Sequence, residues 1–196
     1  MKVVILCGGK GIRMRELTES MPKPLAEVCN KPMLWHIMMG YQHYGFNEFI
    51  LLLGYKGEKI KEYFLDYKWK NNDFTLETDS NTMMFASPQK TNLTITFLDT
   101  GTETQTGGRL KQAQPLTGND PFMLTYGDGL SNVNIAELFK YHTEKGKIAT
   151  VTGINKKSQY GTLDVRNGIA TSFEEKQRHQ GVINGGFFVF EPEIYN

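Results

Sequence analysis

The residues best suited to chemistry are glycines and cations that follow the first apolar run of the chain. Gly8, Gly9 and Gly11 come directly after this run, and Arg13 stands two residues further on. Glycines let the backbone turn sharply and approach a ligand closely, so backbone N–H groups can converge on phosphate oxygens. Arg13 would supply the fixed positive charge that glycines lack. The pattern therefore predicts an anion site after a buried parallel strand over residues 3–7.

Lys23 is the second cation of this candidate site. Pro22 and Pro24 flank it and fix two φ angles, so its long side chain starts from a stiff segment. A tight turn with solvated side chains is the alternative interpretation, because two better-known phosphate loops fit poorly. The Walker pattern requires Ser or Thr where Gly11 stands, and the dinucleotide pattern requires glycine where Met14 stands. Lys23 is thus the feature that favours a phosphate site over a simple turn.

A second glycine-containing loop opens a helix later in the chain. Thr106, Gly107, Gly108 and Arg109 follow a strand expected over residues 93–98. Open α/β sheets bind ligands in loops at the carboxyl ends of their strands, and helix N-termini attract anions. A flexible surface loop is the alternative. We treat this loop as a candidate part of the binding site.

Asp128 lies between Gly127 and Gly129 at the end of a strand expected over residues 121–126. A carboxylate in this position is open to an ion and to phosphate groups. Asp in a glycine-rich turn also occurs for turn formation alone. Leu130 occupies the place of the second acid of a DxD pair. The residue types alone leave both interpretations of Asp128 open.

Strands and helices alternate along most of the chain, which is typical of a parallel sheet wound with helices. Residues 70–92 interrupt this order, and we expect irregular strands there, with 75–77 and 83–85 as candidates. Asn167 and Gly168 predict a β-hairpin between two late strands. Further elements are expected as an extended piece over 25–29, helices over 32–44, 57–67 and 134–146, and strands over 48–53, 148–154, 160–165, 169–173 and 182–190.

The composition limits the class of protein. The 196 residues suffice for one substantial domain, and 22 Lys and Arg residues balance 21 Asp and Glu residues to a net charge of +1. This balance argues against binding to nucleic acid or to a membrane surface and favours small partners. Cys7 and Cys29 form no C-x-x-C pair. Because no apolar segment has the length of a signal peptide or a membrane span, we expect a cytoplasmic protein.

Taken together, these segments resemble the sugar-1-phosphate nucleotidylyltransferases, in the family's order and along the whole chain. Within the family, the chain is most similar to the branch that acts on CTP and glucose 1-phosphate. The family motifs are residues 8–13, Pro22-Lys23-Pro24, 127–129, Tyr160-Gly161, Glu175-Lys176 and 184–186, and the segments similar to that branch are 31–38, 54–64, 106–111 and 125–129.

The resemblance implies a fold and a reaction. The fold would be α/β with a Rossmann-like, doubly wound mixed sheet that is mostly parallel, helices on both faces and a small β-hairpin subregion. The reaction would be CTP + α-D-glucose 1-phosphate → CDP-glucose + pyrophosphate, with Mg²⁺ as cofactor. The product would be a precursor of lipopolysaccharide O-antigen or capsule. A homo-oligomer such as a hexamer is also implied.

The resemblance also implies residue roles. Arg13 would bind the β- and γ-phosphates, Lys23 the α-phosphate, and Asp128 the Mg²⁺ ion. The nucleotide-binding set would be Leu6, Gly8, Gly9, Gly11, Ile12, Arg13, Lys23, Thr106, Gly107, Gly108 and Arg109, of which Gly8, Gly9 and 106–109 would lie near the base. The sugar-phosphate set would be Tyr126, Gly161, Glu175, Lys176, Asn184 and Gly185, with Lys176 on the phosphate. By residue type alone, Glu175 and Lys176 read as solvated surface charges.

Three departures from the family pattern matter. Ile12 replaces the usual Thr and removes a hydroxyl donor, and Gln177 replaces the Pro that usually follows Glu-Lys. Family members also continue past the position of Asn196, and their second magnesium-binding aspartate lies in that later part. We therefore expect a single nucleotidylyltransferase domain over 1–196 that lacks the family's C-terminal part.

Two alternatives stay open. One keeps the chemistry but uses another nucleotide or another phosphorylated substrate. The other is a non-catalytic regulator that binds a nucleotide, which Ile12 and the short C-terminus favour. The retained Arg13, Lys23, Asp128 and Lys176 favour an enzyme.

Overall fold

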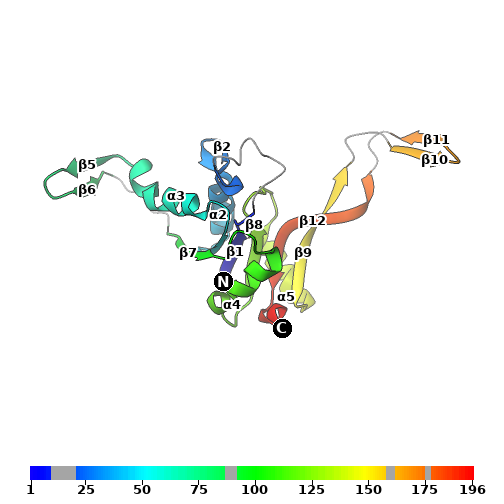
Figure 1. Cartoon of the computed structure of the whole chain (residues 1–196). Helices are drawn as coiled ribbons and strands as arrows, with labels where there is room; N and C mark the ends of the chain where they lie inside the picture. The colour runs from blue at the N-terminus through cyan, green and yellow to red at the C-terminus, as the bar shows by residue number, and fades with distance from the viewer. Residues whose placement is uncertain (10–20, 87–91, 158–161, 175–177) are drawn as a thin grey trace.

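The structure is a computed structural model that describes residues 1–9, 21–86, 92–157, 162–174 and 178–196 (Figure 1). The site predictions for Gly11, Ile12, Arg13, Gly161, Glu175 and Lys176 lie outside these residues.

A six-stranded sheet forms the centre of the molecule. Its order is β7-β4-β1-β8-β12-β9; the first four strands run parallel, and β12 runs antiparallel to both β8 and β9. The strands are β1 (Lys2–Leu6), β4 (Glu48–Leu53), β7 (Thr94–Asp99), β8 (Phe122–Tyr126), β9 (Ala149–Lys157) and β12 (Arg178–Phe190). The predicted mixed, mostly parallel sheet is confirmed.

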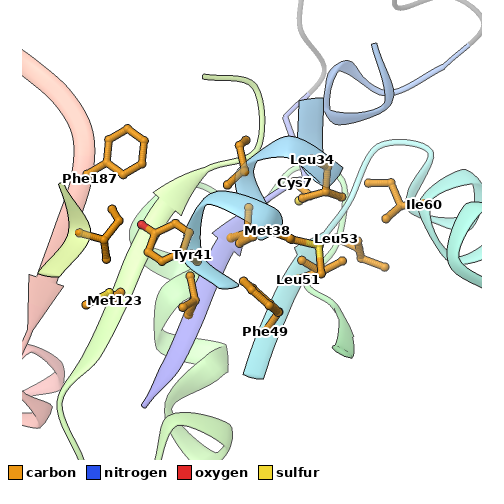
Figure 2. Close-up of a cluster of buried hydrophobic side chains, with 14 of the residues drawn as sticks. Cys7, Leu34, Met38, Tyr41, Phe49, Leu51, Leu53, Ile60, Met123 and Phe187 are labelled. Atoms are coloured by element: carbon orange, nitrogen blue, oxygen red, sulfur yellow. The ribbon is translucent and has the colours of Figure 1, made fainter. Parts of the chain in front are cut away.

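Both faces of this sheet are covered, so its central strands are apolar throughout. In β1, Val3 and Ile5 belong to one buried core and Val4 to the other. Figure 2 shows the first core, where Met38 and Tyr41 of a covering helix pack over the sheet. The first face carries α2 (Met33–His43), α3 (Gly57–Lys70) and α5 (Ile135–Lys145), and the second carries α4 (Thr106–Thr117) and η3 (Pro192–Tyr195). No helix among the described residues is long and apolar enough to cross a membrane.

Three two-stranded hairpins lie outside the main sheet. Asn167 and Gly168 form the predicted turn, with φ angles of +50° and +78° that suit a tight hairpin. The segment over 70–92, which interrupts the alternation of strands and helices, contains another hairpin. This hairpin projects at the end of the molecule opposite to the hairpin of Asn167 and Gly168 (Figure 1). The hairpins are β2 (Glu27–Val28) with β3 (Lys31–Pro32), β5 (Phe74–Glu77) with β6 (Thr82–Phe85), and β10 (Thr162–Arg166) with β11 (Ile169–Glu174).

The extended piece expected over 25–29 is shorter than predicted. Leu25, the first residue of the expected piece, belongs instead to a 3-10 turn, η2 (Lys23–Leu25). The backbone N–H of Ala26 closes this turn by donating to the carbonyl oxygen of Lys23 at 2.9 Å. The two prolines that flank Lys23 fit this turn, since Pro24 needs no N–H donor there.

The strand order creates a crevice between β1 and β8. The chain leaves β1 toward β4 on one side and later returns to β8 on the other, so the connecting loops diverge at this point. Ligands of open α/β sheets bind outside the carboxyl ends of the strands at such a switch point. The fold therefore brings the loops after β1 and β8 to the place where a ligand is expected.

Candidate active site

A cavity of about 720 Å³ lies at this crevice. Its walls come from the ends of β1 and β8, from η2, and from the loop that joins β7 to α4. The lining residues are Leu6, Cys7, Gly8, Gly9, Lys23, Pro24, Thr102, Glu103, Thr104, Gln105, Thr106, Arg109, Tyr126 and Asp128. Eight residues predicted from the sequence, Leu6, Gly8, Gly9, Lys23, Thr106, Arg109, Tyr126 and Asp128, are thus brought together.

Lys23 and Asp128 face each other across this cavity. Lys23 Nζ lies 3.6 Å from Asp128 Oδ2, and their side chains are 20% and 42% exposed. At this distance the two groups form an ion pair but no hydrogen bond. Both groups therefore still have hydrogen-bonding capacity for a ligand. A cation and a carboxylate placed this way can bind a phosphate and a metal ion side by side.

Gly127 explains why Asp128 reaches this position. The N–H of Gly127 donates to the carbonyl oxygen of Leu6 at 3.0 Å, which joins the end of β8 to the end of β1. A Cβ at Gly127 would lie 3.0 Å from Cys7 Sγ and 3.1 Å from both Leu6 O and Pro24 Cγ. Only a residue without a side chain passes this point without displacing its neighbours, and the next residue then projects into the cavity.

Asp128 and Glu103 are the acidic residues in the described cavity lining, and the structure pairs Asp128 with Lys23. Among the described residues, no group of three or more His, Cys, Asp and Glu side chains could hold a metal ion. Mg²⁺ is commonly held by one or two carboxylates together with substrate phosphates and water. The oxygen donors of Asp128 fit that mode, and a dedicated protein cage does not exist in the described part of the chain.

Cys7 forms part of the cavity floor and is 1% exposed. Burial, together with the charge of Asp128, raises the pKa of its thiol well above the ordinary value. Cys29 is exposed. We therefore expect Ellman's reagent to modify Cys29 quickly in the native protein and Cys7 only after unfolding, because the thiolate is the reactive form. Cys29→Ser should abolish the fast phase; two equally fast thiols in the native protein would contradict this arrangement.

The part of the second glycine loop that lines the cavity lies mostly ahead of the motif over residues 106–109 in the chain. Thr102, Glu103, Thr104 and Gln105 form this wall, and they precede the predicted start of the helix. Gly107 and Gly108 lie exposed in the first turn of α4 and are not among the cavity-lining residues that the structure describes. A signal was present in the sequence, since the wall is the run of polar residues between β7 and α4.

Arg109 enters the same region from the first turns of α4. Its side chain is 5% exposed, and its guanidinium donates hydrogen bonds to oxygens of Gly8, Leu53, Thr100 and Thr102. Sequence reasoning placed Arg109 among the residues near the base. The structure places its guanidinium beneath Gly8, in contact with backbone.

Tyr126 and Asn184 meet beside the cavity. Asn184 Nδ2 donates to the Tyr126 hydroxyl at 3.4 Å, while Asn184 Oδ1 accepts from the N–H of Gly186 at 2.8 Å. Gly186 has a φ of +83° and abuts the Tyr126 ring, where an added Cβ would lie 2.9 Å from Cδ2. The pairing of β12 with β9 shifts register between Asn184 and Phe188. Such an irregularity next to a site re-aims side chains, and here it directs Asn184 to Tyr126. Gly185 lies beside them and packs against β9, where an added Cβ would be 2.9 Å from Thr152 O.

The site thus combines a glycine loop, a lysine and a carboxylate at the switch point of a doubly wound sheet, an arrangement typical of α/β proteins that bind phosphate-bearing ligands. The comparisons with known proteins are more specific. The sequence profile of the family described as "Nucleotidyl transferase" matches residues 2–196. The chain belongs to this family.

Two relatives lie within one branch of the family. The chain is 57% identical over 196 residues to a "Probable glucose-1-phosphate cytidylyltransferase" of Bacillus subtilis, covering 100% of this chain and 77% of that protein. It is 42% identical over 196 residues to the "Glucose-1-phosphate cytidylyltransferase" of Salmonella typhimurium, covering 99% of this chain and 76% of that protein. The resemblance inferred from the motifs is confirmed.

Solved structures support the fold. HddC from Yersinia pseudotuberculosis superposes with a TM-score of 0.68 at 22% identity, covering 99% of this chain and 78% of that chain. UDP-glucose pyrophosphorylase from Acinetobacter baumanii superposes with a TM-score of 0.67 at 16% identity, covering 99% and 75% of the two chains. At this level of identity, the likeness bears on the fold alone.

Proposed function

We propose that the protein is a glucose-1-phosphate cytidylyltransferase, which converts CTP and α-D-glucose 1-phosphate into CDP-glucose and pyrophosphate. The proposal draws on the identity of 57% and 42% to two relatives of that name. The structural observation that carries it is the 3.6 Å approach of Lys23 and Asp128 in the crevice between β1 and β8.

The reaction suits a site without a general base. An oxygen of the already ionised sugar phosphate attacks the α-phosphorus of CTP, and the bond from that phosphorus to the bridging oxygen of the β-phosphate breaks. Pyrophosphate leaves with the electron pair of that bond. The obstacles are repulsion between anions and charge that grows on the leaving group, so positioning and electrostatic stabilisation can supply the catalysis.

Lys23 and Asp128 divide this task between them. Lys23, whose ammonium group projects from a rigid 3-10 turn, would bind the α-phosphate at the centre of the displacement. Asp128 would hold Mg²⁺ through its carboxylate oxygens. When bound, the ion neutralises phosphate charge and orients the triphosphate. The ion pair between the two side chains supports this proposal, because it would hold both groups near the phosphates before the substrates arrive.

The other roles extend from this centre. Leu6, Gly8, Gly9 and the wall over 102–106 would contact the nucleotide, and Tyr126 with Asn184 would contact the sugar side. Arg13 and the N–H groups around Gly11 and Ile12 would bind the β- and γ-phosphates. Lys176, with Glu175 and Gly161, would bind the sugar phosphate. These last roles rest on the motifs in the sequence.

The setting of the protein follows from its proposed substrates. CTP and glucose 1-phosphate are cytoplasmic metabolites, so we place the enzyme in the cytoplasm. Assembly into a homo-oligomer stays a prediction, to be checked by light scattering of the purified protein. Use of the product in O-antigen or capsule synthesis is likewise a prediction.

The function is tested by measuring pyrophosphate release with CTP, dTTP, UTP and GTP, each against a panel of sugar 1-phosphates and Mg²⁺. We expect the highest kcat/KM for CTP with α-D-glucose 1-phosphate. If another nucleotide and sugar phosphate gave a higher kcat/KM, that pair would be the substrates, and the reaction type would stay the same. If CTP raised the melting temperature while no pair released pyrophosphate, the protein would be a nucleotide-binding regulator instead.

A further inference from the structure

A two-residue turn closes the hairpin of β10 and β11 at its tip (Figure 1). Arg166 pairs with Ile169, so Asn167 and Gly168 make the turn between them, and both have positive φ angles. In such a turn the flanking residues make the closing hydrogen bonds, and the N–H of the second central residue faces solvent. Asn167 and Gly168 are both exposed. The side-chain amide of Asn167 and the N–H of Gly168 thus lie next to each other in water.

These two groups can react with each other. Once the Gly168 N–H has lost its proton to hydroxide, the nitrogen can attack Cγ of Asn167. A bond forms between these two atoms, the bond from Cγ to Nδ2 breaks, and the leaving nitrogen takes a proton from water to depart as ammonia. The product is a cyclic succinimide, which water opens to aspartate or isoaspartate. Attack is favoured because the reacting atoms are neighbours and Gly168 has no Cβ to shield its nitrogen.

The surroundings of Gly168 leave room for this ring. An added Cβ at Gly168 would meet no atom within 4 Å. Two other asparagines, Asn30 and Asn81, are also exposed and also have positive φ angles. Lys31 and Thr82 follow them, and the side chains of these residues hinder an approach to their backbone nitrogens. Of these three sites, the tip of the β10–β11 hairpin is therefore the one with an unshielded nitrogen.

A second Asn-Gly pair, Asn184 and Gly185, stands in a different environment. Asn184 is exposed too, but its amide is held at both ends: Oδ1 accepts from the N–H of Gly186, and Nδ2 donates to the Tyr126 hydroxyl. Gly185 is crowded, because an added Cβ would lie 2.9 Å from Thr152 O. Ring closure at this pair must break the hydrogen bonds of the amide and displace a packed backbone. Contacts, and not exposure, therefore distinguish the two Asn-Gly pairs.

We propose that Asn167 is a site of spontaneous deamidation through attack by the Gly168 nitrogen, and that the isoaspartyl product opens the β10–β11 hairpin. Isoaspartate routes the main chain through the former side chain, which adds a methylene group to the turn. A two-residue turn fixes the register of its strands, so the longer turn cannot keep Arg166 opposite Ile169. The two strands form a sheet of their own, and a lone two-stranded hairpin is only marginally stable. The reaction requires only water and is independent of the proposed function.

The test follows both Asn-Gly pairs in the intact protein. The protein is incubated at mildly alkaline pH and digested at acidic pH, and mass spectrometry of the peptides detects the replacement of NH2 by OH. We expect conversion at Asn167 to be at least about fivefold faster than at Asn184, because one hydrogen bond of ordinary strength corresponds to this factor. In guanidinium chloride the two rates should converge, since the contacts of Asn184 are lost. Equal rates in the folded protein, or the same ratio after unfolding, would overturn the proposal.

Isoaspartate reports both the route of the reaction and its consequence. A protein isoaspartyl methyltransferase transfers the methyl group of S-adenosylmethionine to an isoaspartyl carboxylate, and it should label the Asn167 peptide of the aged protein. The aged protein should also exchange the backbone amide hydrogens of β10 and β11 faster, with those of β1 and β4 unchanged. Aspartate without isoaspartate would show direct hydrolysis and refute the cyclic route. Unchanged exchange in β10 and β11 would refute the opening of the hairpin.

Asn167→Gln is the matched control variant. Gln keeps the amide but places another methylene group between it and the backbone, which disfavours ring closure onto the Gly168 nitrogen. The variant should lose the fast phase of ammonia release, while conversion at Asn184 keeps its wild-type rate. The melting temperature establishes that the variant is folded. A fast phase that persisted in folded Asn167→Gln would place the reaction at another residue and refute the proposal.

Discussion

Lys23→Ala should lower kcat/KM for pyrophosphate release at least about a hundredfold, equivalent to roughly 2.7 kcal/mol of transition-state stabilisation. The reason is that Lys23 is the described cation that lines the cavity opposite Asp128, and its side chain is only 20% exposed. Among the described residues that line the cavity, the other cation is Arg109, and its guanidinium is bound to protein oxygens. Initial rates at saturating Mg²⁺, with each substrate varied in turn, measure the effect.

The fold should survive this substitution. Partly exposed ion pairs contribute little to stability, so loss of the pair with Asp128 should change the melting temperature only slightly. Lys59→Ala is a suitable control, because Lys59 pairs with Glu62 on the exposed side of α3. Its kinetics should equal those of the wild type. Near-normal turnover by Lys23→Ala would remove Lys23 from the reaction and would undermine the proposed mechanism.

Asp128→Asn should reduce kcat by about two orders of magnitude and raise the Mg²⁺ concentration needed for half-maximal activity. Asn preserves the shape of Asp128 but has no negative charge with which to hold a divalent cation. Because Asp128 is 42% exposed, its replacement should leave the fold intact. A titration with Mg²⁺ at fixed CTP measures the shift, and chelation with EDTA should abolish wild-type activity.

Asp120→Asn provides the comparison. Asp120 is exposed in the turn between α4 and β8 and lies outside the described cavity lining. The same loss of one charge at this position should leave the Mg²⁺ titration unchanged. If Asp128→Asn titrated with Mg²⁺ as the wild type does, the metal would have to be held elsewhere.

Local signals explain how much of the fold was predictable. The buried strands β1, β4 and β8 are continuous apolar runs, and α5 begins where Asn134 Oδ1 accepts a hydrogen bond from the N–H of Glu137 at 3.1 Å. Each of these features depends on residues close together in the chain. The start of η2 was missed because a single turn of 3-10 helix has no apolar period to detect.

The site was predictable in its residue types and not in its spatial relations. Glycines after β1, together with Lys23, predicted a phosphate site from residue types alone, whereas the metal-binding role of Asp128 came only from the resemblance to the family. Their meeting depends on the strand order, which the pairing of β1 with both β4 and β8 establishes. The loop after β7 was predicted as part of the site, but only the structure shows that its residues 102–105, ahead of the glycines, line the cavity.

The amino-acid sequence alone determined that this chain is an α/β member of the nucleotidyl transferase family with its candidate site residues in loops after strands, because backbone geometry, turn formation and charge are properties of short segments. The tertiary structure alone decided that Lys23 faces Asp128 and that the Arg109 guanidinium turns toward Gly8 and Leu53. The physical reason is that a long side chain binds whichever oxygens lie within its reach, and the packing of distant strands determines which oxygens those are.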